Sequence, residues 1–477
     1  MEVMSPLDAA FLRIEDRHTS LHIASLAIFD GPPPSYEQVH RAFLSKLHLV
    51  PRYRQRVVEV PLRLGRPVWV DDTHFSLRYH LRHTALPRPG TDAQLRDLVG
   101  RLMSQQLDRG KPLWETWVVE GLEGDRWAVV SKIHHCMVDG IAGTDLIARV
   151  LDPSADAPLP AAPAEPAPPA EPHAAQLALS AALSLPVTPA AVLRSAMRAV
   201  THPVETAKDA AMTTRGAVAW LRLARPAAAS SLTGPITPHR RWGWTSTTLA
   251  DVRVVRHALG GTVNDVVLTA VTRGFRDLLL ARGEAPDAHA VRTLVPVSVR
   301  RADARGVLDN RVSAMIADLP VGVETADARL LAVRVELDRL KHSGEPQFGE
   351  LLTSAGVLVP PLLLSLGLTG VFRLPHRHLV TVATNVPGPQ QPLYCCGRRM
   401  REYYPYVPIA DRLRIGVAIT SYDGVLGFGV TADEDSTPDL QVLLDGIDAE
   451  LRDLVQLAGG GRPQVVDLTQ PEARTQV

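Results

Sequence analysis

Residues 134–140 read HHCMVDG, and the fold and chemistry expected of this chain follow from this stretch. The strand-like run Trp127–Ile133 leads directly into it, and a helical pattern begins near Ile141, so the two histidines are expected on a loop at the end of a strand. Catalytic groups are often found on such loops. Because the unperturbed pKa of histidine lies near neutral pH, the loop is a candidate site for a general base.

The histidine pair by itself also fits a structural role or a metal site. No cluster of cysteines, histidines or carboxylates nearby in the sequence completes a set of metal ligands, so no metal is expected. Asp139 is suited to pin the loop by pairing with a cation. Gly140 lets the backbone pass close to a substrate or adopt a positive φ.

Outward from the motif, strand-like runs alternate with helical patterns. The expected strands are Ser20–Phe29, Trp127–Ile133, Val291–Val299, Val312–Leu319, Val380–Thr384, Arg414–Thr420 and Val425–Thr431. The expected helices, which place apolar residues at three- and four-residue steps, are Val39–Leu49, Asp92–Leu107, Ile141–Leu151, Val263–Leu280, Ala326–His342 and Leu440–Leu457. The predicted fold class is α/β, with two domains that contain mixed sheets.

A proline- and alanine-rich segment divides the chain. Asp152–Pro172 has no apolar periodicity, which is typical of an extended linker, and Leu177–Ala229 has the pattern of helices that cross between domains. We therefore predict an N-terminal subdomain with the histidine motif at 1–151, a linker with crossover helices at 152–240, a C-terminal subdomain at 241–458 and a disordered tail at 459–477.

The composition excludes several classes of protein. The chain has 477 residues with 51 basic and 51 acidic side chains, so no net charge draws it to nucleic acid, and no nucleic-acid partner is expected. Its three cysteines, Cys136, Cys395 and Cys396, provide no disulfide framework and fit a reducing compartment. The first residues include acids and a proline where a secretion signal has basic and then apolar residues. Cytoplasmic localisation is therefore expected.

Two segments favour contact with a lipid surface. Leu351–Phe372 is uncharged and long enough to span a bilayer, but Pro360 and Pro361 interrupt any helix at its middle. Between Ala190 and Arg241 basic side chains outnumber acidic ones, a pattern that suits anionic lipid and also fits an ordinary solvated helix. We expect peripheral association with the inner face of the membrane or with lipid droplets, without a transmembrane span.

HHxxxDG resembles the signature of the acyl-CoA-dependent acyltransferases, which include chloramphenicol acetyltransferase, carnitine acyltransferases and peptide-synthetase condensation domains. Further motifs are similar to those of the bacterial wax ester synthase/acyl-CoA:diacylglycerol acyltransferase family: SPLDAAF at 5–11, PLWE at 112–115, NDVVL at 264–268 and NVPGP at 385–389. The resemblance covers nearly the whole chain apart from the linker and the tail. Cys136 stands where a small alanine is more usual.

The resemblance implies two chloramphenicol-acetyltransferase-like domains that meet at a tunnel, which acyl-CoA and the acceptor enter from opposite sides. His135 is then the general base, and acyl-CoA is a co-substrate with no separate cofactor. His134 orients its neighbour. Asp139 pairs with an arginine, for which Arg54 is the first choice and Arg300 the second.

The implied reaction moves a long-chain acyl group to diacylglycerol, which gives triacylglycerol, or to a long-chain alcohol, which gives a wax ester. Two alternatives remain: a non-catalytic lipid-binding protein of the same fold, and an acyltransferase for another hydroxyl acceptor. The second includes a glycerol-phosphate acyltransferase, in which His134 and Asp139 would form an HxxxxD motif.

Three more residues have candidate roles around the tunnel. Asn264 starts an apolar helix and is either its N-cap or a donor that faces the tunnel. Trp114 either belongs to the core or lines the acyl tunnel. If residues 134–136 continue an extended chain, Cys136 faces away from His135 and packs in the interior.

Replacing Arg54 or Asp139 with alanine is expected to lower both the melting temperature and the activity. Each change would leave the proposed partner as an unpaired buried charge, at a cost of roughly 3–5 kcal/mol. Thermal unfolding of the single and double variants tests the pair, because the two losses should not add. A double variant as unstable as the sum of the two would assign Asp139 to another partner, with Arg300 tested next.

Overall fold

A computed structural model of the chain describes residues 2–61, 65–137, 150–158, 176, 230–288, 291–298, 312–341, 379–410 and 412–459. Asp139, Gly140 and Arg300 lie outside these ranges. The segments 177–229, 351–372 and 460–477 and most of the predicted helix at 141–151 lie outside them as well.

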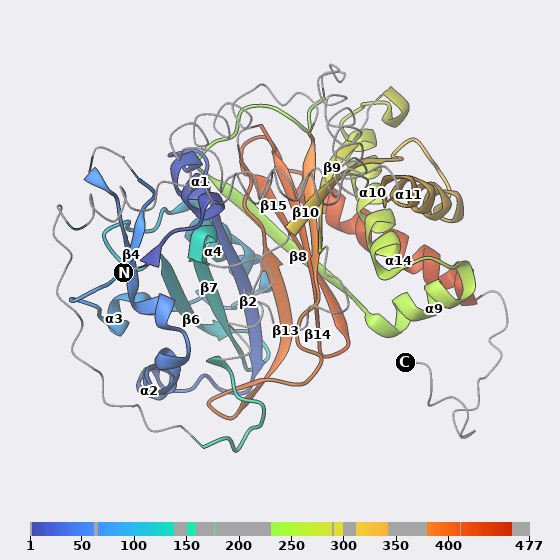
Figure 1. The fold of residues 1–477 in the computed structure, drawn as a ribbon. Coiled ribbons are helices and arrows are strands. Elements are labelled where there is room, and N and C mark those ends of the chain that lie inside the picture. Colours follow the sequence, from blue (N-terminus) through green and yellow to red (C-terminus); the bar gives the residue numbers. More distant parts are fainter. Residues whose placement is uncertain are drawn as a thin grey trace, which may run out of the picture.

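The first sheet has six strands in the order β12-β13-β2-β7-β6-β5 (Figure 1). These strands are β12 Tyr394–Cys395, β13 Arg398–Tyr406, β2 His22–Asp30, β7 Arg126–His134, β6 Trp114–Leu122 and β5 Leu81–Ala85. Neighbours are antiparallel except for β5 and β6, which run parallel. The histidine motif therefore begins at the carboxyl end of a central strand.

The second sheet also has six strands, in the order β10-β9-β11-β14-β15-β8. Its strands are β10 Val312–Leu319, β9 Val291–Ser298, β11 Thr381–Val386, β14 Ile415–Tyr422, β15 Val425–Asp433 and β8 Arg240–Thr248. The strand β11 runs parallel to both of its neighbours, and the other pairs are antiparallel. The α/β class and the mixed sheets are thus confirmed.

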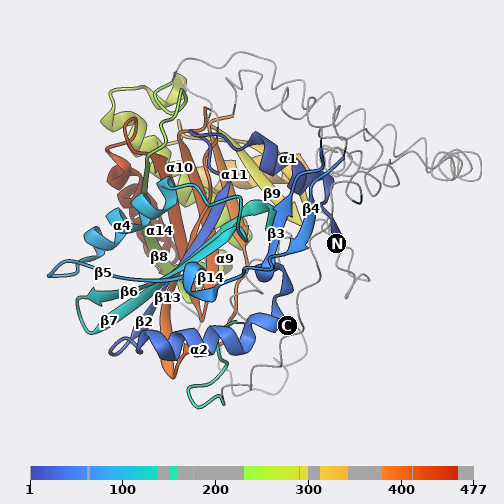
Figure 2. The same ribbon diagram turned by 90° about the vertical axis from the view of Figure 1, so that its left-hand side faces the viewer.

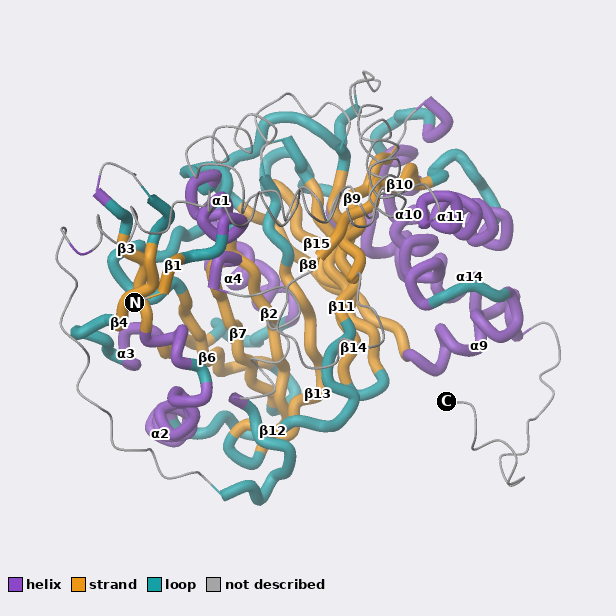
Figure 3. Tube along the Cα trace, in the orientation of Figure 1, coloured by secondary structure: helices purple, strands orange, loops and turns teal. Residues whose placement is uncertain are grey.

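The C-terminal half contributes strands to the first sheet. Although β12 and β13 belong to residues 394–406, β13 pairs with β2 near the start of the chain. The sequence did not predict that strands from the C-terminal half join this sheet. The pairing brings β13 against β15, where a Cβ on Gly429 would lie 1.7 Å from the carbonyl oxygen of Pro405. The bare backbone of Gly429 therefore allows the two sheets to lie side by side, as Figure 3 shows.

Helices α2 (Tyr36–Lys46) and α4 (Asp92–Ser104) cover opposite faces of the first sheet. Both begin with a capping box, formed by Ser35 with Gln38 and by Thr91 with Gln94. The apolar side of α2 packs with one set of strand residues and that of α4 with the other set. Alternation along β2 and β7 supplies these two faces, because successive side chains of a strand point in opposite directions.

One face of the second sheet is covered by a helical layer that faces outward in Figure 1. It consists of α9 Leu249–Leu259, α10 Val263–Ala281, α11 Ala326–Lys341 and α14 Leu440–Gly459. In this layer Arg329 and Glu450 form a fully buried ion pair. Arg329 also donates to the carbonyl oxygens of Val323 and Glu324, which offsets part of the cost of burying its charge.

The remaining elements are a small third sheet and several short helices. A small sheet has the order β1-β4-β3, with β1 Glu2–Val3, β4 Val68–Asp71 and β3 Gln55–Val58. The short helices are α1 Pro6–Ile14, α3 Leu77–His80, η1 Leu47–Leu49, η2 Pro51–Arg54, η4 His135–Met137 and η6 Pro286–Ala288. Figure 2 shows β3 and β4 beside the larger sheet. No helix in the described ranges is long and apolar enough to cross a membrane.

All seven predicted strands are present, and each end lies within two residues of its predicted position. Of the six predicted helices, the five that fall within the described ranges are also present. Eight strands in the described part of the chain were not predicted: the short strands β1, β3, β4, β5 and β12, and the long strands β6, β8 and β13. In the long ones, tryptophans, tyrosines and arginines interrupt a simple apolar alternation.

Candidate active site

The two histidines lie where β7 ends and a tight turn begins. His134 is the last residue of β7, and residues 135–137 form the short 3₁₀ helix η4. The backbone N–H of His134 donates to Leu113 O at 2.9 Å, and that of His135 donates to Leu21 O at 2.9 Å. The loops that precede β6 and β2 therefore hold the backbone of the motif on both sides.

The ring of His135 packs against α1. Its centroid lies 4.5 Å from that of the Phe11 ring, at an interplanar angle of 50°. Burial lowers the pKa of His135 to about 4, so the ring is neutral near pH 7. Its Nδ1 is buried and has no hydrogen-bond partner among the described residues. A neutral imidazole in this position is able to accept a proton.

Cys136 faces an apolar cluster that includes Met4, Leu12, Trp69 and Leu113. The premise that residues 134–136 continue an extended chain is wrong, because the 3₁₀ turn begins at His135. The thiol is nevertheless buried, and burial raises its pKa well above the ordinary value. A thiolate nucleophile is disfavoured there, because burial in apolar surroundings favours the neutral thiol.

Behind the motif lies a buried acid, Glu15, which was not among the residues predicted for the site. Oε2 of Glu15 lies 3.6 Å from Nε2 of His134 and 2.8 Å from Nη2 of Arg109, while Oε1 lies 3.0 Å from Nε2 of His22. Glu15 follows the SPLDAAF motif by four residues and His22 lies within a predicted strand, so neither stood out from a single sequence. Within the described ranges, no group of His, Cys, Asp and Glu side chains has a geometry suited to a metal ion.

Trp114 belongs to the core of the first sheet. Its side chain is fully buried, and its ring stacks between Tyr53 at 4.4 Å and His80 at 4.6 Å, measured between centroids. Its Nε1 donates to the carbonyl oxygen of Tyr53 at 2.8 Å.

Arg54, which follows Tyr53 in the sequence, places its guanidinium 5.9 Å from the centre of the Phe75 ring. Its proposed pairing with Asp139 stays a prediction, because Asp139 lies outside the described residues.

Asn264 lies in the first turn of α10 and is not its N-cap. Thr262 occupies that position and forms a capping box with Asp265, so this alternative for Asn264 is wrong. Thr262 is the last residue with extended dihedral angles before the helix, which makes it the cap. A contact between Asn264 and the substrate stays a prediction.

The NVPGP segment forms a close contact after β11. The backbone N–H of Gly388 donates to Oγ of Ser421 at 3.3 Å, and a Cβ at this glycine would lie 2.3 Å from the carbonyl oxygen of Ser421. A larger residue would push the loop away from the β14–β15 hairpin. Such a rigid turn fits the proline and glycine residues of the segment.

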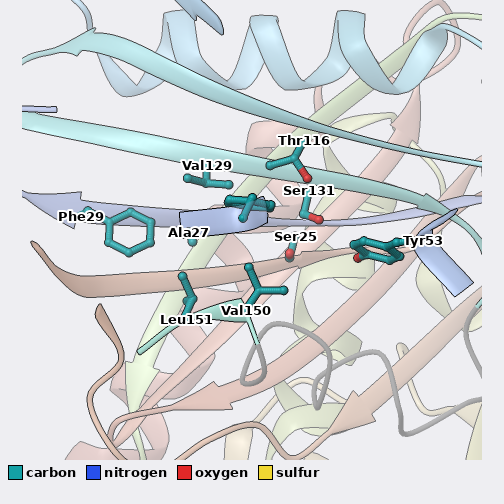
Figure 4. A pocket seen from close by; sticks show the side chains of 10 residues that line it. Ser25, Ala27, Phe29, Tyr53, Thr116, Val129, Ser131, Val150 and Leu151 are labelled. Carbon is teal, nitrogen blue, oxygen red and sulfur yellow. The ribbon is translucent and has the colours of Figure 1, made fainter. Parts of the chain in front are cut away.

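A small cavity lies against one face of the first sheet, as Figure 4 shows. Its volume is about 40 Å³, and Phe29, Ala27 and Leu151 form its apolar end. Ser25 and Ser131 face each other across β2 and β7 and supply hydroxyl groups at the other end. The cavity is much smaller than a typical ligand site of about 300–1,000 Å³, so by itself it is not the tunnel that the resemblance implies.

Two family models match the chain. Residues 4–267 match the wax ester synthase/diacylglycerol acyltransferase catalytic domain, and residues 308–455 match the C-terminal domain of the same enzymes. A probable diacylglycerol O-acyltransferase of Mycobacterium tuberculosis is 40% identical over 463 residues, which cover 96% of each chain. A second, putative diacylglycerol O-acyltransferase of that organism is 33% identical, over 96% of this chain and 92% of the other.

Solved structures share the fold. The wax ester synthase/diacylglycerol acyltransferase of Marinobacter aquaeolei VT8 is 27% identical, with a TM-score of 0.68 over 96% of this chain and 100% of the other. The starter condensation domain of rhizomide synthetase, solved with C8-CoA, has a TM-score of 0.54 and 14% identity over 96% of this chain and 95% of the other. The second match, at 14% identity, supports a shared chloramphenicol-acetyltransferase-like fold and says nothing about a shared activity.

The stability of the protein is expected to fall as the pH is lowered from about 6.5 to 4. Burial lowers the pKa of His22 and of His80 to about 4, whereas in the unfolded chain they titrate near 6.5. Between these pH values the unfolded state binds more protons than the folded state. Protonation of each of the two histidines therefore lowers the free energy of unfolding by at most about 3 kcal/mol. Urea unfolding at pH 7 and pH 5 measures the loss, and equal midpoints would contradict it. His22→Asn should weaken the dependence on pH.

Proposed function

The chain belongs to the wax ester synthase/diacylglycerol acyltransferase family and is an acyltransferase, and we propose that it moves a long-chain acyl group from acyl-CoA to diacylglycerol. The product is triacylglycerol. A long-chain alcohol is the second acceptor and yields a wax ester. The names of the relatives in two bacterial genera support both acceptors.

The observation that carries this proposal is the neutral His135 ring on the turn after β7. Its backbone is held by Leu21 and its ring by Phe11, so the imidazole has a defined position. Because the pKa of His135 is lowered to about 4 by burial, the base form is present throughout the neutral range. The adjacent Cys136 is packed among apolar side chains, which favours direct transfer over an acyl-cysteine.

In the proposed reaction, His135 takes the proton from the acceptor hydroxyl while that oxygen attacks the thioester carbonyl. The new carbon–oxygen bond forms, the carbon–sulfur bond breaks, and the histidine returns the proton to the departing CoA sulfur. Acyl-CoA thus serves as a co-substrate and no cofactor is consumed. In this scheme His134 orients its neighbour, and Asp139 and Gly140 shape the loop.

The competing function is a lipid-binding protein that keeps the fold without turnover. Release of free CoA from palmitoyl-CoA, followed with a thiol reagent, separates the two functions. We expect release that depends on added diacylglycerol or long-chain alcohol, and a panel of acceptors with one acyl-CoA then ranks them. Binding of palmitoyl-CoA without release under any acceptor would favour the lipid-binding protein.

His135→Ala is expected to lower the rate of CoA release at least a hundredfold, in line with the roughly 10²–10⁴-fold contribution of a general base. Circular dichroism of the variant checks that its fold is intact. Cys136→Ala serves as the matched control and should keep most of the activity, because the thiol packs in the interior. The opposite pattern, or an acyl adduct on Cys136 after mixing with acyl-CoA alone, would overturn direct transfer.

We also propose that the protein acts at the surface of a membrane or lipid droplet, because its proposed acceptors are lipids. The uncharged segment 351–372 and the basic segment 190–241 motivate this proposal. Washing a membrane fraction with high salt or carbonate should release much of the protein. Retention in the pellet until detergent is added would contradict peripheral association.

A further inference from the structure

Glu15 is a buried carboxylate for which the proposed reaction has no direct use. It occupies the C-cap position of α1, and its side chain is 3% exposed. Burial by itself raises the pKa of Glu15, but the contacts with His134 and His22 outweigh burial and hold the pKa well below its usual range. The carboxylate is therefore charged. A buried charge is costly unless its surroundings compensate it, so its partners are informative.

Those partners are two histidines and one arginine. His22 and His134 stand directly opposite each other on β2 and β7, and their ring centroids are 5.7 Å apart. Residues opposite each other in an antiparallel pair project to the same face, so both rings present Nε2 to Glu15. Arg109 contacts the carboxylate and also donates to the carbonyl oxygen of Leu12 in α1.

The other nitrogen of His134 holds the turn. Nδ1 accepts a hydrogen bond from the backbone N–H of Cys136 at 3.1 Å. His134 precedes the first residue of η4, so its side chain satisfies a free N–H at the start of the turn in the manner of an N-cap. A ring nitrogen that accepts a hydrogen bond carries no proton, which leaves the proton of the neutral ring on Nε2, opposite Glu15.

We propose that Glu15 is a positioning residue that acts on His135 through His134. Its carboxylate, 3.6 Å from Nε2, favours the tautomer with the proton on that nitrogen, and Nδ1 is thereby free to hold the Cys136 N–H and the turn that carries His135. With the proton on Nδ1, two donors would face each other and the turn would be released. The role given to His135 rests on the proposed function.

The expected effect is on kcat, because a displacement of about 1 Å at a catalytic group costs up to a hundredfold in rate. Glu15→Met removes the carboxylate at similar volume and should lower kcat ten- to a hundredfold, with KM for palmitoyl-CoA within about twofold. Glu15→Gln keeps an oxygen near Nε2 and should recover much of the loss. Asp16→Asn is the control, because Asp16 accepts from the backbone of His18 and Thr19 and should leave kcat unchanged.

A second experiment uses a variant in which the hydrogen bond to the Cys136 N–H no longer depends on the tautomer of His134. In His134→Asn the amide oxygen can take the place of Nδ1 and accept the Cys136 N–H without a ring proton. Adding Glu15→Met to this variant should lower kcat less than twofold, whereas a role of Glu15 that bypasses His134 would give the full loss.

The decisive measurement is the tautomer of His134, read from long-range ¹H–¹⁵N spectra of protein labelled at histidine, with its signals assigned by their loss in His134→Asn. We expect the Nε2–H form in the unmodified protein and a mixed or Nδ1–H form in Glu15→Met. If Glu15→Met does not fold, Glu15→Gln is measured and should keep the Nε2–H form. An Nδ1–H form in the unmodified protein would overturn the inference, as would a wild-type kcat in a folded Glu15→Met. This readout needs no turnover, so it stands apart from any failure of the proposed reaction.

Discussion

The antiparallel pairing of β2 with β7 positions the rest of the site. It runs from Asp30 opposite Arg126 to His22 opposite His134, where β7 ends and the turn with His135 begins. The register decides which side chains meet there, because a slip of one residue would send every side chain to the other face. With this register, His22 and His134 share one face, and α1 can place Glu15 between them and Phe11 against His135.

Burial sets the protonation states of the groups at the motif. The same exclusion of water lowers the pKa of His135 and raises that of Cys136, so the histidine is a neutral base and its neighbour an inert thiol. The carboxylate of Glu15 remains charged although it is buried, because its contacts with His134 and His22 hold its pKa low. The guanidinium of Arg109 lies 2.8 Å from the same carboxylate. The three groups thus have different roles through their contacts: Glu15 and Cys136 are buried, and His135 is half-buried.

Much of the fold could be predicted from the sequence, because apolar periodicity records which side of an element is buried. The helix at 263–281 and the strand at 425–433 follow directly from such patterns. The pairing of β13 with β2 could not be predicted, because it joins residues about 370 positions apart and leaves no local trace. One alternative placed Asn264 at the N-cap of α10, but Thr262 occupies that position. The N-cap depends on where the backbone becomes helical, and the residue types in this segment suit either position.

The candidate site was predictable at its centre and less so around it. The family resemblance of the motif points to His135, but Glu15 and His22 become neighbours of His134 only through α1 and the strand register. Initial rates of CoA release, measured over a grid of palmitoyl-CoA and acceptor concentrations, distinguish direct transfer from an acyl-enzyme. For direct transfer we expect double-reciprocal lines that intersect, because both substrates must be bound together before His135 acts. Parallel lines would indicate an acyl-enzyme intermediate and contradict direct transfer.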